Sequence, residues 1–183
     1  MTSRLAPVAT GAFGGALYAL SLPKADLGWL AWLCLVPPLV FSARSGPVAQ
    51  APRRLAVAGF TFGLTSGLGR VYWVAETLQV YGGLDWLPAV LTMCLLTAYL
   101  ALYPAIFFSL VPWLATVGSA FPWLAASAWA LLDWVQTWMI SGFPWSLLGY
   151  TQYRLPALAQ IAAFAGVHGI TYLIVLANAA LAG

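Results

Sequence analysis

Charged side chains inside long apolar stretches are the residues of this sequence with the most evident chemistry. Arg70 lies about 9 Å along a helix axis from the nearer end of its stretch. Helical side chains lean toward the helix N-terminus, so its guanidinium points inward. An unpaired guanidinium in an apolar medium is costly. We expect Asp133, at comparable depth in a later stretch, to pair with it and fix the packing of two helices.

The other reactive side chains carry weaker signals. Glu76 stands near the end of the stretch that contains Arg70, where a solvated helix end is the simplest interpretation. His168 is predicted to be a neutral imidazole that is hydrogen-bonded to a neighbouring helix. Cys34 and Cys94 lack metal-ligand spacing, and we expect both to be small buried hydrophobic residues. No metal site and no cofactor are therefore expected.

Composition decides the class of protein that must hold these residues. Of 183 residues, 63% are hydrophobic and 6% are charged, with a mean hydropathy of +0.91. A soluble domain of this length needs roughly a quarter of its residues charged, so the surface is expected to face a lipid bilayer. The net charge of +3 comes from scattered residues, which excludes the basic patch of a nucleic-acid-binding protein.

The apolar stretches predict an all-α membrane protein: one domain, a bundle of about six transmembrane helices. The first stretch also has the outline of a cleaved signal peptide, but its length and the lack of a small-x-small cleavage site favour a span. Pro37 and Pro38 shorten or kink the second span. Pro112 and Gly118 separate the fourth from the fifth. The predicted spans are about 5–22, 27–42, 55–78, 87–111, 120–140 and 156–181.

The distribution of basic residues predicts the orientation of the bundle. Short loops rich in Lys and Arg stay in the cytoplasm. A cytoplasmic N-terminus places four arginines inside, namely Arg4, Arg44, Arg53 and Arg54. Only Lys24 and Arg154 then fall in outer loops, which comprise residues 23–26, 79–85 and 141–156.

The last of these loops is aromatic, almost uncharged, and punctuated by Gly and Pro. It contains Gly142-Phe143-Pro144-Trp145 and then Gly149-Tyr150. On these motifs the chain resembles the membrane part of bacterial apolipoprotein N-acyltransferase. Further segments agree in order and spacing: Tyr72-Trp73-Val74, Tyr81-Gly82-Gly83, Ala98-Tyr99-Leu100-Ala101-Leu102-Tyr103 and Gly166-Val167-His168-Gly169-Ile170.

The resemblance implies a multi-pass protein of the bacterial inner membrane. In that family an acyl chain passes from a phospholipid, through a cysteine thioester, to the N-terminal amine of a diacylated apolipoprotein during lipoprotein maturation. A nitrilase-like domain with a Glu, Lys and Cys triad performs this chemistry, and it follows the membrane helices. No such domain is recognisable here, so we expect a fragment or one product of a split gene that is inactive alone.

A substitute triad cannot be assembled from Glu76, Lys24 and Cys34 or Cys94. A nucleophilic thiolate needs an electropositive, partly exposed setting, and both cysteines lie among apolar residues. The resemblance also implies a Glu and an Arg in the fifth helix, where this chain has Asp133 and Gln136. Losing that Arg removes one candidate partner for a lipid headgroup.

Candidate contacts for the phospholipid therefore concentrate at the outer end of the bundle. Arg70 has a second interpretation as a ligand of the donor phosphate, and the loop aromatics as the lining of an acyl-chain entrance or as interfacial anchors. The candidates are Arg70, Glu76, Asp133, Gly142, Phe143, Pro144, Trp145 and Tyr150. Two other classes stay open: a small transporter or channel subunit, and a non-catalytic membrane scaffold.

Overall fold

The computed structural model describes residues 5–43, 45 and 51–183, and all regular structure within them is helical. The predicted all-α fold is thus confirmed, with no strand in the described ranges. Arg4 and Arg44, used to predict the orientation, lie outside these ranges. The α-helices are α1 (Ala6–Ser21), α2 (Val36–Ala43), α3 (Ala51–Val80), α4 (Trp86–Leu114), α5 (Phe121–Gln136), α6 (Pro156–Ala159) and α7 (Ala162–Ala182). The 3-10 helices are η1 (Gly28–Trp32), η2 (Ala115–Ala120), η3 (Met139–Ser141) and η4 (Leu148–Gln152).

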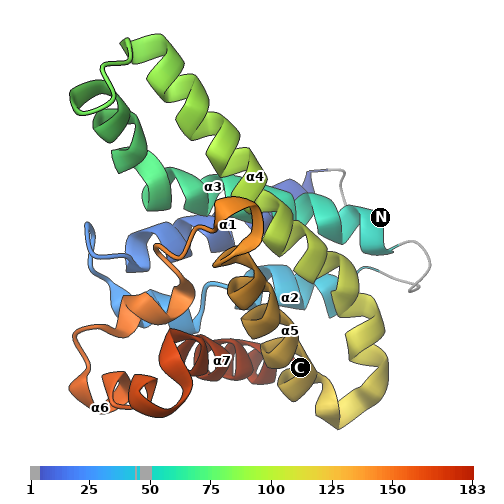
Figure 1. The fold of residues 1–183 in the computed structure, drawn as a ribbon. Coiled ribbons are helices and arrows are strands. Elements are labelled where there is room, and N and C mark those ends of the chain that lie inside the picture. The colour runs from blue at the N-terminus through green and yellow to red at the C-terminus, as the bar shows by residue number, and fades with distance from the viewer. Residues whose placement is uncertain (1–4, 44, 46–50) are drawn as a thin grey trace.

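The long helices α3 and α4 form an antiparallel hairpin that is the backbone of the bundle (Figure 1). A row of glycines on α3, Gly59, Gly63 and Gly67, faces α4. A Cβ atom at any of them would clash with α4. Small residues allow helix backbones to approach closely. Helices inside a membrane associate through such close packing, because no hydrophobic effect drives them together there. The turn of this hairpin projects beyond the other helices (Figure 1).

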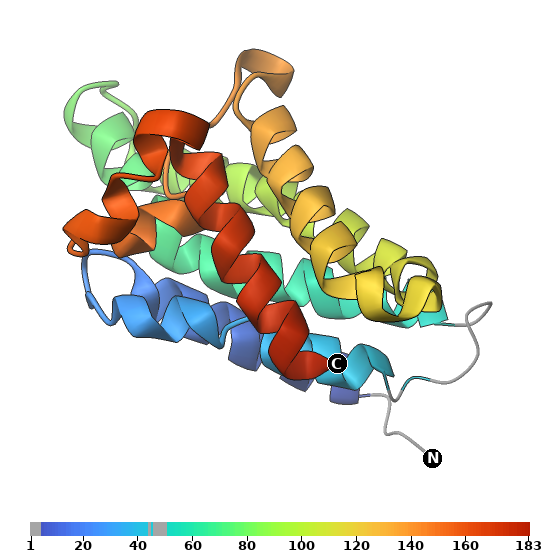
Figure 2. The ribbon, with the colours of Figure 1, turned by 90° about the horizontal axis from the view of Figure 1, so that it is seen from below.

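The remaining helices close around this hairpin. Helix α1 packs on α3, and α7 packs against α5 and α2 (Figure 2). Aromatic rings fill the centre: Phe62 of α3 contacts Tyr18, Phe108 and Trp129, at centroid distances of 5.9 to 6.0 Å. Phe107 stacks edge-on against Trp129 at 4.9 Å. Such pairs stabilise a core through ring geometry as well as burial.

The outer surface of the bundle is apolar. Phe164 is 94% exposed and Leu95 is 73% exposed, and large apolar surfaces mark contacts with a membrane or another protein. Two helical stretches of the described chain, Trp86–Gln136 and Ala162–Ala182, are long and apolar enough to cross a bilayer. The first contains α4 and α5, which turn at Gly118 in a left-handed conformation with φ +60°.

The second and sixth predicted spans contain irregular backbone. In the second, η1 and α2 are separated at residues 33–35. Asn178 of α7 accepts a hydrogen bond from the Leu35 N–H (2.9 Å) and donates one to the Ala31 carbonyl (3.0 Å), which satisfies groups that a continuous helix would pair internally. In the sixth, α6 precedes α7, and α7 itself bends at Gly166.

Two detailed expectations about side chains change. Cys34 is buried as predicted, but Cys94 is exposed, so its predicted burial was wrong. It lies in the N-terminal part of α4, shortly after the turn that joins α3 to α4. The Nδ1 atom of His168 is buried without a hydrogen-bond partner among the described residues, so it does not make the predicted bond.

Candidate functional site

The aromatic loop, residues 142–152, follows directly on an abrupt end of α5. Left-handed backbone at Ile140 (φ 50°), Gly142 (φ 74°) and Ser146 (φ 54°) reverses the chain. At Gly142 a Cβ atom would also collide with the Thr137 carbonyl, so only glycine fits. A β-branched residue such as Ile140 is strained in this conformation. Surrounding contacts must hold the loop in place.

Hydrogen bonds from three helices supply those contacts. The Gln136 side chain of α5 donates to the Phe143 carbonyl (3.0 Å), and the Phe143 N–H donates to the Gln136 carbonyl (2.8 Å). The Tyr18 hydroxyl of α1 donates to the Ser146 carbonyl (2.9 Å). The Ser146 hydroxyl donates to the Arg70 carbonyl of α3 (3.4 Å). The first half of the loop is therefore fixed to the bundle.

Three aromatic rings join the loop to the outer part of α3. Trp145 lies edge-on to Trp73 (6.2 Å between centroids) and to Phe143 (5.2 Å). Phe143 is buried against α3 and α4, whereas Trp145 is 53% exposed. The Trp73 indole N–H donates to the Arg70 carbonyl (3.0 Å). Trp145 thus presents a rigidly supported apolar ring at the surface, and Tyr150 is a second exposed ring of the loop.

The second half of the loop is held by the segment that follows α1 and by α7. The Gln152 amide donates to the Gly28 carbonyl (2.9 Å), and its oxygen accepts from the Trp32 indole N–H (3.1 Å). The Gly149 N–H donates to the Thr171 hydroxyl of α7 (3.0 Å). The predicted loops 23–26 and 141–156 therefore meet at the same end of the bundle.

Charged groups at this end make an exposed cluster. Arg154 forms a salt bridge with Asp26, and the Tyr153 hydroxyl donates to the Asp26 carboxylate (2.9 Å). The hydrogen bond to Tyr153 and the nearby Asp26 charge raise the pKa of the Arg154 guanidinium above its ordinary value, so it stays charged. Lys24 lies 3.9 Å from the ring centroid of Tyr72, as a cation–π contact.

Beneath the loop, Arg70 and Asp133 line one internal cavity of about 10 Å³. Arg70 is 6% exposed and Asp133 is 9% exposed. The structure brings together the two charges that the sequence paired, yet we find no direct ion pair between them in the described chain. The Arg70 guanidinium instead lies 5.4 Å from the ring centroid of Tyr18.

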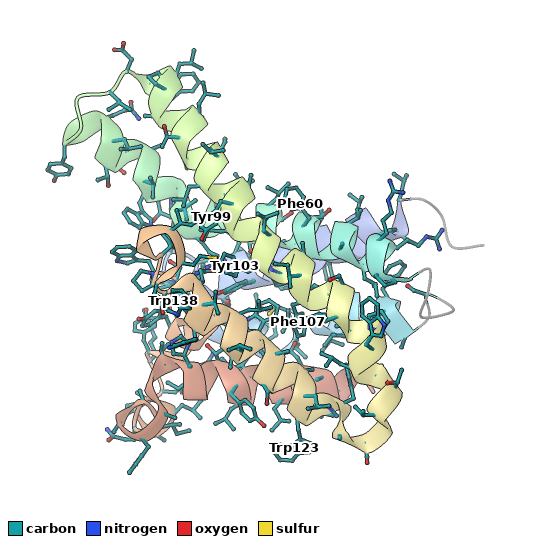
Figure 3. All side chains as sticks on the ribbon, turned by 45° about the vertical axis from the view of Figure 1, so that its right-hand side comes forward. Phe60, Tyr99, Tyr103, Phe107, Trp123 and Trp138 are labelled. Carbon is teal, nitrogen blue, oxygen red and sulfur yellow. The ribbon has the colours of Figure 1, made fainter. Side chains whose placement is uncertain are left out.

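Two tyrosines of α4 extend this polar region toward the loop. Tyr99, Tyr103 and Phe107 occupy successive turns of α4 (Figure 3). The hydroxyls of Tyr99 and Tyr103 are 2.6 Å apart, and the Tyr99 hydroxyl donates to the Met139 carbonyl (3.4 Å). Tyr103 also lines the cavity. A hydrogen-bonded row therefore runs from Tyr103, in the lining of the cavity, through Tyr99 to the chain just before the loop.

The predicted site residues fall into different settings. Glu76 is exposed on the projecting part of α3, and Pro144 is half-buried in the loop. Sequence reasoning missed Tyr18 and the anchoring role of Gln136. No sequence pattern indicates the partner of either residue. Tyr18 bonds to a carbonyl 128 positions away, and Gln136 bonds across an irregular turn.

These features define an all-helical bundle with an apolar exterior and a rigid aromatic loop at one end. The family model described as the apolipoprotein N-acyltransferase N-terminal domain matches residues 14–180. The chain belongs to this family, as its N-terminal region.

Curated relatives agree with this assignment. An apolipoprotein N-acyltransferase of Geobacter metallireducens is 38% identical over 175 residues, covering 91% of this chain and 31% of the relative. One from Chromobacterium violaceum is 36% identical over 177 residues, covering 93% and 32%. One from Vibrio cholerae is 35% identical over 135 residues, covering 73% and 26%. The chain spans about a third of the length of these relatives or less.

Proposed function

We propose that this chain is the membrane portion of an apolipoprotein N-acyltransferase, which transfers an acyl chain from phospholipid to the N-terminal cysteine amine of lipoproteins. The observation that carries the proposal is the family match over residues 14–180 in a chain that spans about a third of its relatives. Its part is to hold the catalytic domain at the outer leaflet and to guide lipid substrates. The chemistry belongs to the rest of the enzyme, and this chain alone is inactive.

The proposed topology follows the sequence prediction. The chain crosses the bacterial inner membrane about six times, with a cytoplasmic N-terminus and with the aromatic loop at the outer surface. The apolar exterior supports a lipid environment. The meeting of loops 23–26 and 141–156 at one end supports an even number of crossings between them.

The candidate lipid contacts divide by exposure. Trp145, Tyr150 and Glu76 are exposed and can meet a lipid or the catalytic domain directly. Buried Phe143 supports the Trp145 ring. Four further candidates act by shaping or supporting the loop: Gly142 and Pro144 through its backbone, Arg70 through its carbonyl, and Asp133 through the cavity beneath it.

A chimera tests the proposal. This chain is joined to the C-terminal two thirds of the Geobacter metallireducens relative, replacing the relative's own N-terminal region. Purified proteins are incubated with phospholipid and a diacylated lipopeptide, and mass spectrometry detects the triacylated product. The chimera should form product, and the chain alone should form none. Product from the chain alone, or a folded chimera without activity, would contradict the division of labour.

Matched tryptophan variants test the role of the loop. Trp145→Ala in the chimera should lower the rate of product formation, because it removes the exposed ring that we propose meets the acyl chain. Trp123→Ala is the control, since Trp123 is similarly exposed (57% against 53%) but lies at the start of α5, away from the loop (Figure 3). Equal rates for both variants would argue against a role for Trp145 beyond interfacial anchoring.

A further inference from the structure

The cavity between Arg70 and Asp133 is lined by side chains from four helices. Tyr18 comes from α1, Arg70 from α3, Tyr103 from α4, and Trp129, Asp133 and Gln136 from α5. The polar atoms of this lining are deeply buried. The proposed function gives the cavity a supporting role beneath the loop and does not say what occupies it.

Three buried polar atoms at this place have no hydrogen-bond partner among the described residues. They are the Arg70 Nε, the Trp129 Nε1 and the Asp133 Oδ2. Leaving such groups unpaired is unfavourable, most of all for charged groups. In a membrane no solvent can reach them from the side. A bound polar molecule is the general solution for buried groups of this kind.

The missing partner can be identified from its hydrogen-bonding pattern. The Arg70 Nε–H and the Trp129 Nε1–H are donors, and Asp133 Oδ2 is an acceptor. Arg70, Trp129 and Asp133 all line this cavity, and Arg70, Trp129 and Thr171 all lie close enough to interact with the Asp133 carboxyl. A water molecule accepts two hydrogen bonds and donates two. It satisfies all three atoms and keeps one hydrogen for another oxygen.

Tyr103 can supply that oxygen. The Tyr99 hydroxyl donates to the Met139 carbonyl, so the 2.6 Å contact between the tyrosines is assigned as Tyr103 donating to Tyr99. This assignment leaves the Tyr103 oxygen free to accept.

Size and charge agree with a single water. The cavity volume of about 10 Å³ is at the lower limit for one water molecule, roughly 10–15 Å³. The lining carries one basic and one acidic side chain, so its formal charge balances and it favours a neutral occupant over an ion. We propose that one structural water molecule occupies this cavity and bridges Arg70, Trp129 and Asp133.

Radiolytic footprinting of the purified chain in nanodiscs tests the proposal, because hydroxyl radicals formed from a bound water oxidise only its neighbours. Phe107 and Phe108 are a matched pair: both are fully buried, but only Phe107 lines the cavity. Phe107 should be oxidised several-fold more than Phe108. After rapid mixing with H₂¹⁸O, the heavy label should appear at Phe107 more slowly than at exposed Trp145.

Each result of this experiment either supports or contradicts a bound water in the cavity. Equal protection of Phe107 and Phe108 would mean a dry cavity. Label arriving at Phe107 as fast as at Trp145 would mean an open channel to bulk water. The double variant Arg70→Met with Asp133→Leu, which removes the polar partners, should abolish the oxidation of Phe107. If that variant does not fold, Trp129→Phe removes one donor only and should reduce the Phe107 signal or speed the exchange of the label. Oxidation and exchange unchanged in a folded variant would overturn the proposal.

Discussion

Gln136→Leu tests whether helix α5 fixes the aromatic loop. The substitution keeps the size of the side chain and removes the amide that donates to the buried Phe143 carbonyl. Leaving that carbonyl without a hydrogen-bond donor costs about 1–3 kcal/mol in water-soluble proteins. In membrane bundles a side-chain hydrogen bond contributes at most about 1.7 kcal/mol to stability. We therefore expect the substitution to lower the free energy of local opening of the loop by about 1–2 kcal/mol. This predicts amide exchange at Phe143 accelerated roughly 5- to 30-fold.

Hydrogen exchange read by mass spectrometry measures this effect directly, because the Phe143 N–H is itself bonded to the Gln136 carbonyl. Gln79→Leu is the matched control. The Gln79 amide donates to the Ala75 carbonyl within its own helix and does not touch the loop. Exchange at Phe143 that stays within twofold of the wild type, or that rises equally in the control, would refute the anchoring argument.

Four further substitutions or reagents probe the rest of the bundle. Gly63→Leu should destabilise the α3–α4 hairpin by about 1–3 kcal/mol through overpacking, measured by thermal unfolding in detergent. Asn178→Leu should destabilise the fold by about 2 kcal/mol or more, because two backbone groups near η1 lose their partner. Arg154→Met should leave the melting temperature unchanged, since the salt bridge it removes is exposed. In detergent, N-ethylmaleimide should modify exposed Cys94 and spare buried Cys34 until the protein unfolds.

Each of these expectations has a result that contradicts it. Ser109→Ala is the stability control for the first two, because its hydroxyl bonds only within its own helix at an exposed position. Stability losses equal to that control would remove the packing and hydrogen-bonding arguments. A large fall in melting temperature for Arg154→Met would mean that the exposed pair is more than a surface contact. Equal labelling of both cysteines would contradict the described burial.

The helical fold and the special character of the aromatic loop could be predicted from the sequence. Long uncharged stretches can satisfy their backbone in an apolar medium only as helices or closed barrels. Pro37 and Pro38 also indicated an irregular second stretch. What could not be predicted was the residue that pairs with the free backbone there, because Asn178 lies 143 positions from Leu35.

Burial was harder to predict than helicity. In a soluble protein an apolar residue such as Cys94 points to the core, but lipid makes the outside of a bundle as apolar as its inside. Hydrophobicity then no longer separates the two faces of a helix, and Cys94 was placed in the core wrongly. The Arg70 and Asp133 side chains were correctly expected to be neighbours. Whether they touch depends on small shifts between helices that no residue pattern encodes.

The aromatic loop is bonded to residues that lie far from it in the sequence, and this has a consequence for biogenesis. Tyr18 and Gly28, which bond to the loop, are made 128 and 124 residues before their partners Ser146 and Gln152. During synthesis Tyr18 of α1 and Gly28 of η1 therefore lack these partners until the chain beyond α5 has been made. Closure of the loop is one of the last steps of assembly, and only a complete bundle can present Trp145 to its surroundings.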